Sequence, residues 1–529
     1  MKLKFRLIVY VLAIIALCLL RLELDKGDVF ITSDGQIKFY QAIQYKHNGL
    51  LSTECYYPAK DIDKTYQFFP FEYPWTRLKN STCIFQYSPF FSYLGTLISV
   101  LFNDFFVMYI SILFCFFCMI VFDRILSLLD VKEPIIAIST ILTFILSFPI
   151  LTIIDFSEMS LFHFLVLGGL YISIKIYLAA EQKPLDGTIF RLLLFQSFLF
   201  GLSFLLRGEI VLLGGIFYAV NLIFFGFIFL KIRSIAFLAI GLSMPIIFYG
   251  IFHKLQMGNP LGYRLLSILD NSKHSMSVQE HITIGIGYLY GNKIMIGIFK
   301  AFPGLALSAF IFVPKIYREI PRYIKVLFAI GFSYIMIASF SITVYGGVGY
   351  FGLRYLEPGY IILLIVITYI TSHSIHFSKN WKSVLLLFVM VLFMIRSIQF
   401  IKRGITHLHG ASVFYHGLQS KFAKVGNSGY ILHTSYNTSY LIGYSFLKQK
   451  HLIPYTLSDF ENIEKQIYEK GEEIFIVVDT PKDHYVSADI PKEKYPKFKN
   501  RYKIEPKYFE VVGKENFLEY ELYTLKRKK

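Results

Sequence analysis

An aspartate stands at the start of an aromatic stretch that directly follows the first apolar run of the chain. It is Asp34, in the sequence SDGQIKFY of residues 33–40. A carboxylate in such a place can accept the proton of a hydroxyl nucleophile, which is the task of a general base. An ordinary solvated loop residue is the alternative. The residue types alone leave both readings of Asp34 open.

Further ionisable residues follow two later apolar runs. Asp155 and Glu158 come after the run near 134–153, and Arg207 and Glu209 come after the run near 189–206. Ionisable side chains at the ends of membrane segments are functional candidates, because burying them in lipid is costly. An arginine there could bind a phosphate through its planar, bidentate guanidinium. Helix capping by the two acids of the first group, and an arginine–glutamate pair in the second, are the structural alternatives.

A glycine-rich stretch near residue 350 holds the remaining candidates. Its sequence, YGGVGYFGLRYLEP, begins at Tyr345 and includes Arg354. Glycine lets the backbone approach a ligand closely, so Arg354 is a second phosphate candidate and Tyr345 is a candidate for substrate binding. Arg354 could instead snorkel to the membrane surface or pair with Glu357.

Composition identifies the environment in which these residues must be placed. The chain has 529 residues, of which 55% are hydrophobic and only 17% charged, and its mean hydropathy is +0.53. Its apolar runs have the length that a helix needs to cross a bilayer. They lie near 5–20, 88–102, 105–122, 134–153, 159–178, 189–206, 210–230, 234–252, 298–313, 324–342, 357–373 and 382–398. The sequence predicts an α-helical polytopic membrane protein with about 11–12 hydrophobic segments.

The positive charges also fit a membrane protein. The net charge is +17, but no basic region combines with a nucleic-acid-binding module, so no nucleic-acid partner is predicted. The basic residues between the apolar runs alternate consistently when they are placed in the cytoplasm, provided that the run 88–102 enters the bilayer without crossing it. The first run lacks a cleavage site of small residues and is predicted to be an uncleaved anchor. All candidate residues then fall on the non-cytoplasmic side, together with the C-terminal tail.

The chain changes character at about residue 399. Charged residues become more frequent there, and short strand-like runs alternate with helical stretches. This pattern predicts a small C-terminal α/β domain at 399–529, after a transmembrane domain at 1–398 that includes a large external loop at 23–87. The loop is rich in aromatic residues and holds Cys55 and Cys83, which either form a disulfide or remain two thiols.

The order of these features resembles the GT-C superfamily of membrane glycosyltransferases, which includes protein mannosyltransferases and lipid A aminoarabinose transferases. The resemblance rests on residues 33–42, 87–91, 201–209 and 346–358, with a weaker addition at 257–262. The order and placement of these stretches extend it over most of residues 1–398. It implies a sugar transfer from a polyprenyl-phosphate-linked donor.

The resemblance also implies roles for individual residues. Asp34 matches the acid that these enzymes place in their first external loop, which favours a catalytic role as the base. Glu158 and Asp155 match the second external loop, where relatives carry an acid near the acceptor or a metal, and Glu158 is the second catalytic candidate. The substrate-binding candidates are Arg207, Arg354, Glu209, Asp155 and Tyr345.

Two features depart from the family pattern. Relatives often have an acidic pair in the first loop and consecutive prolines at the next helix, whereas Gly35 follows Asp34 here and Ser88 precedes the single Pro89. No cluster of His, Cys and Asp has the spacing of metal ligands. No metal site and no definite cofactor are therefore predicted, although use of a divalent cation stays open.

The sequence thus predicts an inverting glycosyltransferase of the bacterial inner membrane, with its active site and C-terminal domain in the periplasm. Its partners would be a polyprenyl-phosphate-linked sugar, membrane lipids, and a cell-envelope glycan or lipid acceptor, for example in lipopolysaccharide biosynthesis. An envelope-glycan polymerase or ligase that uses lipid-diphosphate oligosaccharides is the first alternative. A non-enzymatic membrane transporter is the second, although a transporter would show inverted repeats and place polar residues at mid-membrane.

Overall fold

The protein divides into two compact units. The computed structural model describes residues 3–25, 33–71, 76–79, 82–182, 187–262, 266, 277–292, 296–341, 352–374, 381–435, 442–479, 502–518 and 520–529. The helical unit comprises Met1–Arg21 and Met108–His407, and the α/β unit comprises Leu22–Val107 and Leu408–Lys529. These units differ from the predicted domains, because the boundary at 398/399 falls inside helix α18 (Trp381–Phe422).

The helical unit is built mainly from long apolar helices. Its elements are α1 (Leu3–Asp25, whose last residues belong to the α/β unit), α5 (Ile110–Leu128), α6 (Glu133–Phe144), α7 (Pro149–Ile153), α8 (Met159–Gln182), α9 (Gly187–Leu206), α10 (Ile210–Phe229), α11 (Ile232–Met257), α13 (Val278–Tyr290), α14 (Ile298–Ala301), η2 (Pro303–Phe312), α15 (Pro314–Glu319), α16 (Arg322–Ser341), η3 (Gly352–Leu356), α17 (Glu357–Ser374) and the first part of α18. Among the described residues of the whole chain, eight helices are long and apolar enough to span a membrane, and three shorter apolar helices accompany them. This confirms the predicted class of polytopic helical membrane protein.

Prolines divide two of the predicted segments. The run 134–153 forms α6 and α7 instead of one helix, because Pro149 lacks the N–H that a continuous helix needs. The run 298–313 likewise forms the short helix α14 and the 3-10 helix η2, which begins at Pro303. The first break creates the short helix that holds Thr152.

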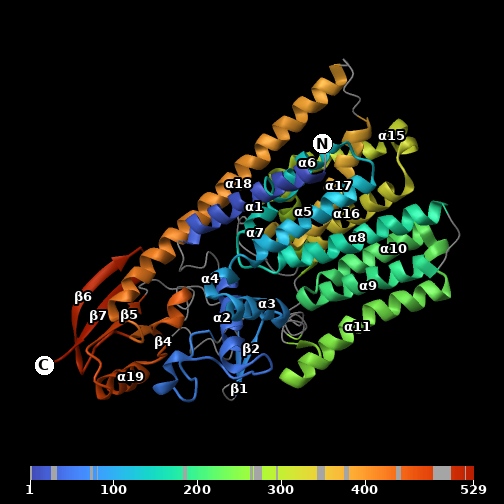
Figure 1. Ribbon diagram of the computed structural model, residues 1–529. Coiled ribbons are helices and arrows are strands. Elements are labelled where there is room, and N and C mark those ends of the chain that lie inside the picture. The colour runs from blue at the N-terminus through green and yellow to red at the C-terminus, as the bar shows by residue number, and fades with distance from the viewer. Residues whose placement is uncertain are drawn as a thin grey trace. The chain divides into compact units, whose positions relative to one another are not determined.

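Close packing fixes the position of α17. Helix α16 packs against it, and a Cβ atom on Gly359 would lie 2.9 Å from the carbonyl oxygen of Gly331. Only glycine permits two backbones to approach so closely. In the same unit α9 packs against both α8 and α11, and these helices can be followed from cyan to green in Figure 1.

The α/β unit combines the segment after α1 with the C-terminal part of the chain. Its elements are α2 (Ser33–Asn48), η1 (Pro58–Asp61), β1 (Thr76–Lys79), β2 (Thr82–Phe85), α3 (Pro89–Leu101), α4 (Asp104–Val107), the end of α18, η4 (Ala423–Val425), β3 (Tyr430–His433), η6 (Gly443–Leu447), β4 (Lys450–Leu452), α19 (Leu457–Glu469), β5 (Ile474–Asp479), β6 (Phe509–Phe517) and β7 (Tyr520–Arg527). The predicted C-terminal α/β fold is confirmed: its sheet has the order β4-β3-β5-β7-β6, with β3 parallel to both neighbours and β7 antiparallel to both of its own. Helix α3 has 13 residues, fewer than the roughly 20 that span a bilayer, which agrees with a segment that does not cross.

Both faces of the five-stranded sheet are covered. On one face, the end of α18 packs against the strands through a cluster of Leu418, Phe422, Ile431, Ile476, Val478 and Leu522. On the other face, Leu432 and Val477 share a core with Tyr40, Cys55 and Phe69. The segment expected as an external loop of the transmembrane domain therefore folds as part of the α/β unit.

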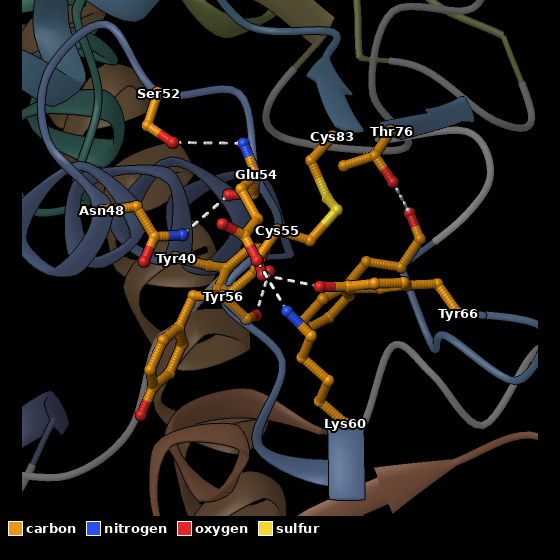
Figure 2. Close-up of a disulfide and its surroundings, with 11 residues drawn as sticks. Tyr40, Asn48, Ser52, Glu54, Cys55, Tyr56, Lys60, Tyr66, Thr76 and Cys83 are labelled. Atoms are coloured by element: carbon orange, nitrogen blue, oxygen red, sulfur yellow. Dashed lines mark hydrogen bonds and ion pairs between the residues drawn. A yellow bond between two sulfur atoms is a disulfide. The ribbon is translucent and has the colours of Figure 1, made fainter. Parts of the chain in front are cut away.

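A disulfide strengthens this second core (Figure 2). Cys55 and Cys83 are joined across a separation of 28 residues, and both are buried. Loop-closure entropy for a loop of this length corresponds to about 3.6 kcal/mol of stabilisation. The alternative of two free thiols, which the sequence left open, is thereby removed.

Burial affects two groups of ionisable side chains in the α/β unit differently. Asp61 accepts hydrogen bonds from Tyr430 at 2.8 Å and from Lys450 at 2.9 Å. Burial raises the pKa of Asp61, but these hydrogen bonds outweigh burial and hold the pKa below its usual value. Nε2 of His433 and Nδ1 of His451 lie 2.9 Å apart in the interior. Burial lowers the pKa of His433 to about 3 and places that of His451 well below its usual value.

Candidate functional site

Asp34 lies in the first turn of α2, where its side chain is held in a fixed direction. The Tyr87 hydroxyl donates a hydrogen bond to Asp34 Oδ1 at 2.6 Å. A negative charge in the first turn of a helix also interacts favourably with the helix dipole. Tyr87 comes from the chain just before α3, so two separate segments of the α/β unit position this carboxylate.

A buried lysine accompanies Asp34 on α2. Lys38 follows one helical turn later, only 4% of it is exposed, and its ammonium lies 4.9 Å from the centre of the Tyr87 ring. Residues four apart lie on the same side of a helix, so α2 presents an acid and a cation together. The sequence alone indicated no role for Lys38 or Tyr87. The four-residue spacing of acid and lysine was the signal that could have found Lys38.

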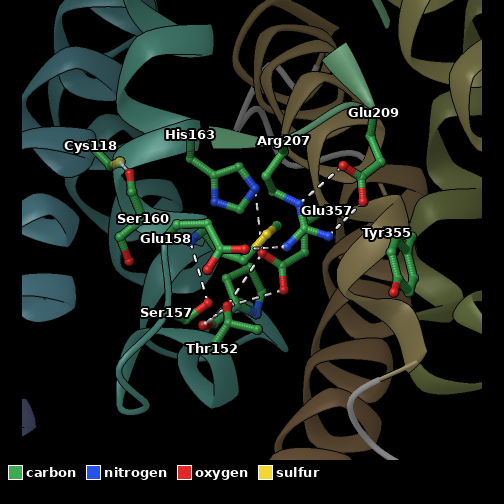
Figure 3. A network of polar contacts seen from close by, with 12 residues as sticks. Cys118, Thr152, Ser157, Glu158, Ser160, His163, Arg207, Glu209, Tyr355 and Glu357 are labelled. Atoms are coloured by element: carbon green, nitrogen blue, oxygen red, sulfur yellow. Dashed lines mark hydrogen bonds and ion pairs between the residues drawn. The ribbon is translucent and has the colours of Figure 1, made fainter. Parts of the chain in front are cut away.

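A second group of polar side chains lies in the helical unit, at the ends of α8 and α9 (Figure 3). Arg207, the residue after α9, donates from Nη1 to Glu158 Oε1 at 3.0 Å. It also donates from Nη2 and Nε to the two carboxylate oxygens of Glu209, at 2.6 and 3.2 Å. Arg207 and Glu158 are each 4% exposed. The structure thus joins three predicted site residues in one buried cluster, and it includes the arginine–glutamate pair considered as the structural alternative.

The two arginine candidates contact the same aromatic ring. The guanidinium carbon of Arg207 lies 5.5 Å from the centre of the Tyr355 ring, and that of Arg354 lies 5.2 Å from it. A guanidinium within about 6 Å of a ring centre is attracted to the ring face. Arg354 also donates a hydrogen bond to the Tyr355 hydroxyl at 3.4 Å. Tyr355 therefore brings together the two residues that the sequence assigned to phosphate binding.

Arg207 keeps part of its hydrogen-bonding capacity. A guanidinium has five N–H donors. Within the described part of the chain, three of those donors are used, two toward Glu209 and one toward Glu158. The remaining two can bind the oxygens of an anionic ligand without breaking either carboxylate contact.

A buried acid and histidine adjoin this cluster. Glu357 is fully buried at the start of α17 and accepts a hydrogen bond from Thr152 Oγ1, 3.1 Å from Oε1. His163 Nε2, on α8, lies 3.3 Å from Glu357 Oε2. Sequence analysis mentioned Glu357 only as a partner for Arg354, and it missed Thr152 and His163. An ionisable His163 inside an apolar helix was the available signal.

Asp155 lies at the break between α7 and α8 and is 5% exposed. Next to it along the chain, the carbonyl oxygen of Ile154 accepts a hydrogen bond from Arg21 at 2.6 Å. Arg21 is itself fully buried, and sequence analysis gave it no role. Besides Arg207, the helical unit therefore holds a further buried arginine, bonded to the backbone next to a predicted acidic residue.

One candidate cannot be placed, and the donor set does not fit a metal. Tyr345 lies outside the described residues. Across the described ranges of the chain, no group of three or more His, Cys, Asp or Glu side chains is arranged to hold a metal ion. Glu158 and Glu209 instead point to a guanidinium. No chemical step is therefore derived through a metal.

Comparison with known proteins supports the fold. No family model matches the sequence, and no curated protein matches it either. ArnT from Cupriavidus metallidurans bound to undecaprenyl phosphate aligns with a TM-score of 0.57 and 11% identity, over 99% of this chain and 98% of that chain. The chain has a GT-C fold.

Two further solved structures are similar to this chain. ArnT from the same organism without ligand aligns with a TM-score of 0.53 and 12% identity, over 98% and 97% of the two chains. The oligosaccharyltransferase of Archaeoglobus fulgidus in complex with Zn and sulfate has a TM-score of 0.48 and 11% identity, over 88% of this chain and 68% of that chain. The resemblance to GT-C proteins that the sequence indicated is confirmed at the level of the fold by the two ArnT structures.

Proposed function

We propose that this protein is an inverting membrane glycosyltransferase that moves a sugar from a polyprenyl-phosphate donor to a cell-envelope glycan or lipid acceptor. One observation carries the proposal. In a chain with a GT-C fold, the first helix after α1 carries Asp34 in its first turn, and the Tyr87 hydroxyl orients its carboxylate at 2.6 Å. An acid so placed fits the base that such a reaction requires.

The proposed reaction exchanges one bond at the anomeric carbon of the sugar. The acceptor oxygen attacks this carbon from the side opposite the phosphate and forms the new glycosidic bond. The bond from the carbon to the phosphate oxygen breaks, and its electron pair leaves with the phosphate. Asp34 takes the proton of the acceptor hydroxyl. Attack from the opposite side inverts the configuration of the sugar.

The leaving phosphate needs positive charge, because it gains a negative charge when the bond breaks. We assign this role to Arg207 and Arg354, which both contact Tyr355. Glu158 and Glu209 hold the first of these arginines in place from two sides. Two cations on one ring, with N–H donors left on one of them, suit a phosphate better than a neutral ligand.

The proposed side of the membrane is the non-cytoplasmic one, which is the periplasm in the bacterial inner membrane. The disulfide between Cys55 and Cys83 supports this, because such bonds persist in oxidising compartments and are rare in the cytosol. The basic residues that fit a cytoplasmic placement between the apolar runs support the same orientation.

The experiment that tests the proposal uses the purified full-length protein. It is incubated with undecaprenyl-phosphate-linked sugars, one at a time, together with a lipopolysaccharide fraction as acceptor. Released undecaprenyl phosphate and the glycan product are measured by mass spectrometry. We expect equal amounts of both for one donor, with the new linkage of opposite anomeric configuration. Turnover of lipid-diphosphate oligosaccharides instead would establish the polymerase or ligase alternative and refute the proposal.

A further inference from the structure

An apolar groove within the helical unit is separate from the residues discussed above. It has a volume of about 270 Å³ and is bounded by α6, η2, α17 and α18. Representative wall residues are Ile138, Leu142, Leu305, Leu364 and Phe393. Because most of its lining side chains are apolar and α17 is long and apolar enough to span a membrane, hydrocarbon is the content that suits it.

Two of the hydroxyl groups that line the groove are bonded to the backbone of their own helices. Thr143 Oγ1 donates to the carbonyl oxygen of Ser139 on its own helix, at 2.7 Å. Ser397 Oγ donates to the carbonyl oxygen of Phe393 at 3.1 Å, also within its helix. Hydroxyls bound to their own backbone offer little to a polar ligand. The groove therefore selects its contents by shape and by carbon contacts.

The length of the groove matches one leaflet of a membrane. Its walls include Tyr360 and Thr371 on α17, and at 1.5 Å per residue these positions are about 16 Å apart along the helix. The hydrocarbon core of a bilayer is about 30 Å thick, so one leaflet is about 15 Å. An acyl chain from one leaflet fits this length, whereas a long polyprenyl chain exceeds it.

The two ends of the groove differ. At one end, the Tyr360 ring packs against Phe148 and Phe302, with ring centres 4.7 and 5.3 Å away, and closes the groove with aromatic side chains. At the other end, Ser372 follows the wall residue Thr371 and accepts a hydrogen bond from the backbone N–H of Lys132 at 3.0 Å. The Lys132 side chain is exposed there between the exposed acids Asp130 and Glu133, so this end offers charges of both signs, as the headgroup of a zwitterionic phospholipid requires. The groove thus has one closed end and one end suited to a headgroup.

The groove is open along one side as well. Ile138, on the α6 wall, is 59% exposed. A lipid chain can therefore enter sideways from the bilayer. An empty groove would leave its walls without contacts that packed interiors normally have.

We propose that this groove binds one acyl chain of a glycerophospholipid from the leaflet on the Lys132 side. The bound chain fills the space between α6, η2, α17 and α18 and steadies α17. The inference does not rest on the proposed sugar transfer. It concerns a lipid that is neither donor nor acceptor.

The test compares variants whose new side chains fill the groove with a control variant that carries a bulky change outside it. Gly304 lines the groove, and a Cβ atom there would lie an ordinary 3.7 Å from Phe393, so Gly304→Leu places its side chain in the groove without a backbone clash. Ala306→Leu on the same element η2 is the control, because Ala306 is exposed. Ser139→Phe fills the groove from the α6 wall and provides an independent second variant.

Each full-length protein is purified from membranes in mild detergent and examined by native mass spectrometry, followed by lipid extraction. We expect one glycerophospholipid per chain in the wild type and in Ala306→Leu. Gly304→Leu and Ser139→Phe should each retain about tenfold less, equivalent to about 1.4 kcal/mol. Equal retention in all four proteins would overturn the proposal. So would a polyprenyl phosphate, rather than a phospholipid, as the molecule that the two filling variants lose.

Discussion

Replacing Arg207 by leucine tests whether the polar cluster is one cooperative unit. The guanidinium contacts Glu158 and Glu209, and both Arg207 and Glu158 are almost fully buried. Removing one partner of a buried ion pair costs about 3–5 kcal/mol, because the remaining charge keeps its desolvation cost and loses its compensation. Arg207→Leu should therefore destabilise the helical unit by about that amount.

The geometry also predicts an asymmetry between the partners. Glu158→Gln leaves Arg207 with both hydrogen bonds to Glu209, so its cost should be only about 1–3 kcal/mol. In the double variant Arg207→Leu/Glu158→Gln, the Glu158 carboxylate is removed together with the arginine that compensates its charge. Its cost should be smaller than the sum of the single costs, with a coupling of about 0.5–3 kcal/mol.

The assay is the midpoint of heat-induced unfolding of the purified protein in detergent. On the scale of large soluble domains, the loss for Arg207→Leu corresponds to a fall of about 6–20 °C. Arg318→Leu, on the exposed part of α15, is the matched control and should shift the midpoint little. Equal midpoints for the two arginine variants, or strictly additive costs in the double variant, would refute a coupled buried cluster.

Three further predictions concern the α/β unit. The folded-state pKa of His433 is about 3, below its usual value. The contribution of neutral His433 to the free energy of unfolding is therefore complete above pH 6.5 and falls as the pH drops toward 3. At pH 5 the free energy of unfolding should be lower by about 2 kcal/mol. Hydrogen exchange of β3 should accelerate accordingly, and His409→Gln, an exposed control, should leave this pH dependence unchanged. Cys83→Ser should lower the free energy of unfolding of this unit by about 3–4 kcal/mol in denaturant titrations. A reductant should lower the stability of the wild type by the same amount, whereas the control Cys18→Ser should leave it unchanged. An unchanged unfolding midpoint for Cys83→Ser would contradict the structural role of the disulfide. Tyr87→Phe, which removes a charge-assisted hydrogen bond, should reduce turnover by about tenfold with little change in KM; a change in KM alone would argue for simple substrate contact.

The sequence predicted the helical class and the location of most candidates, because apolar runs and the charges at their ends are local features. Asp34, Arg207 and Glu209 became candidates for this reason. The pairing of Arg207 with Glu209 was also foreseeable, since the two residues are only two positions apart. Ring contacts and hydrogen bonds between segments that are distant in the sequence were not foreseeable. Tyr87 is 53 residues from Asp34, and the sequence contains no local signal that joins them.

The division of the chain was the hardest feature to predict. The segment after α1 was expected as an aromatic-rich external loop, and aromatic residues are also common at membrane surfaces. Its aromatic side chains instead complete the core of the C-terminal sheet, as when Tyr40 meets Phe446 with ring centres 5.0 Å apart. Aromatic residues favour both environments, so composition cannot choose between them. Glu357 and His163 were missed for a related reason, since each lies in an apolar run that reads as simple membrane helix.

The most direct test of the account is sugar transfer by Asp34→Asn, measured as released undecaprenyl phosphate with a donor that the wild type accepts. Asp104→Asn is the matched control, because Asp104 lies in the same unit but forms a salt bridge with Lys46. The account predicts that Asp34→Asn loses about 10²–10⁴-fold in turnover at unchanged protein abundance, as expected for removal of a general base. Turnover of Asp34→Asn equal to that of Asp104→Asn would contradict the account.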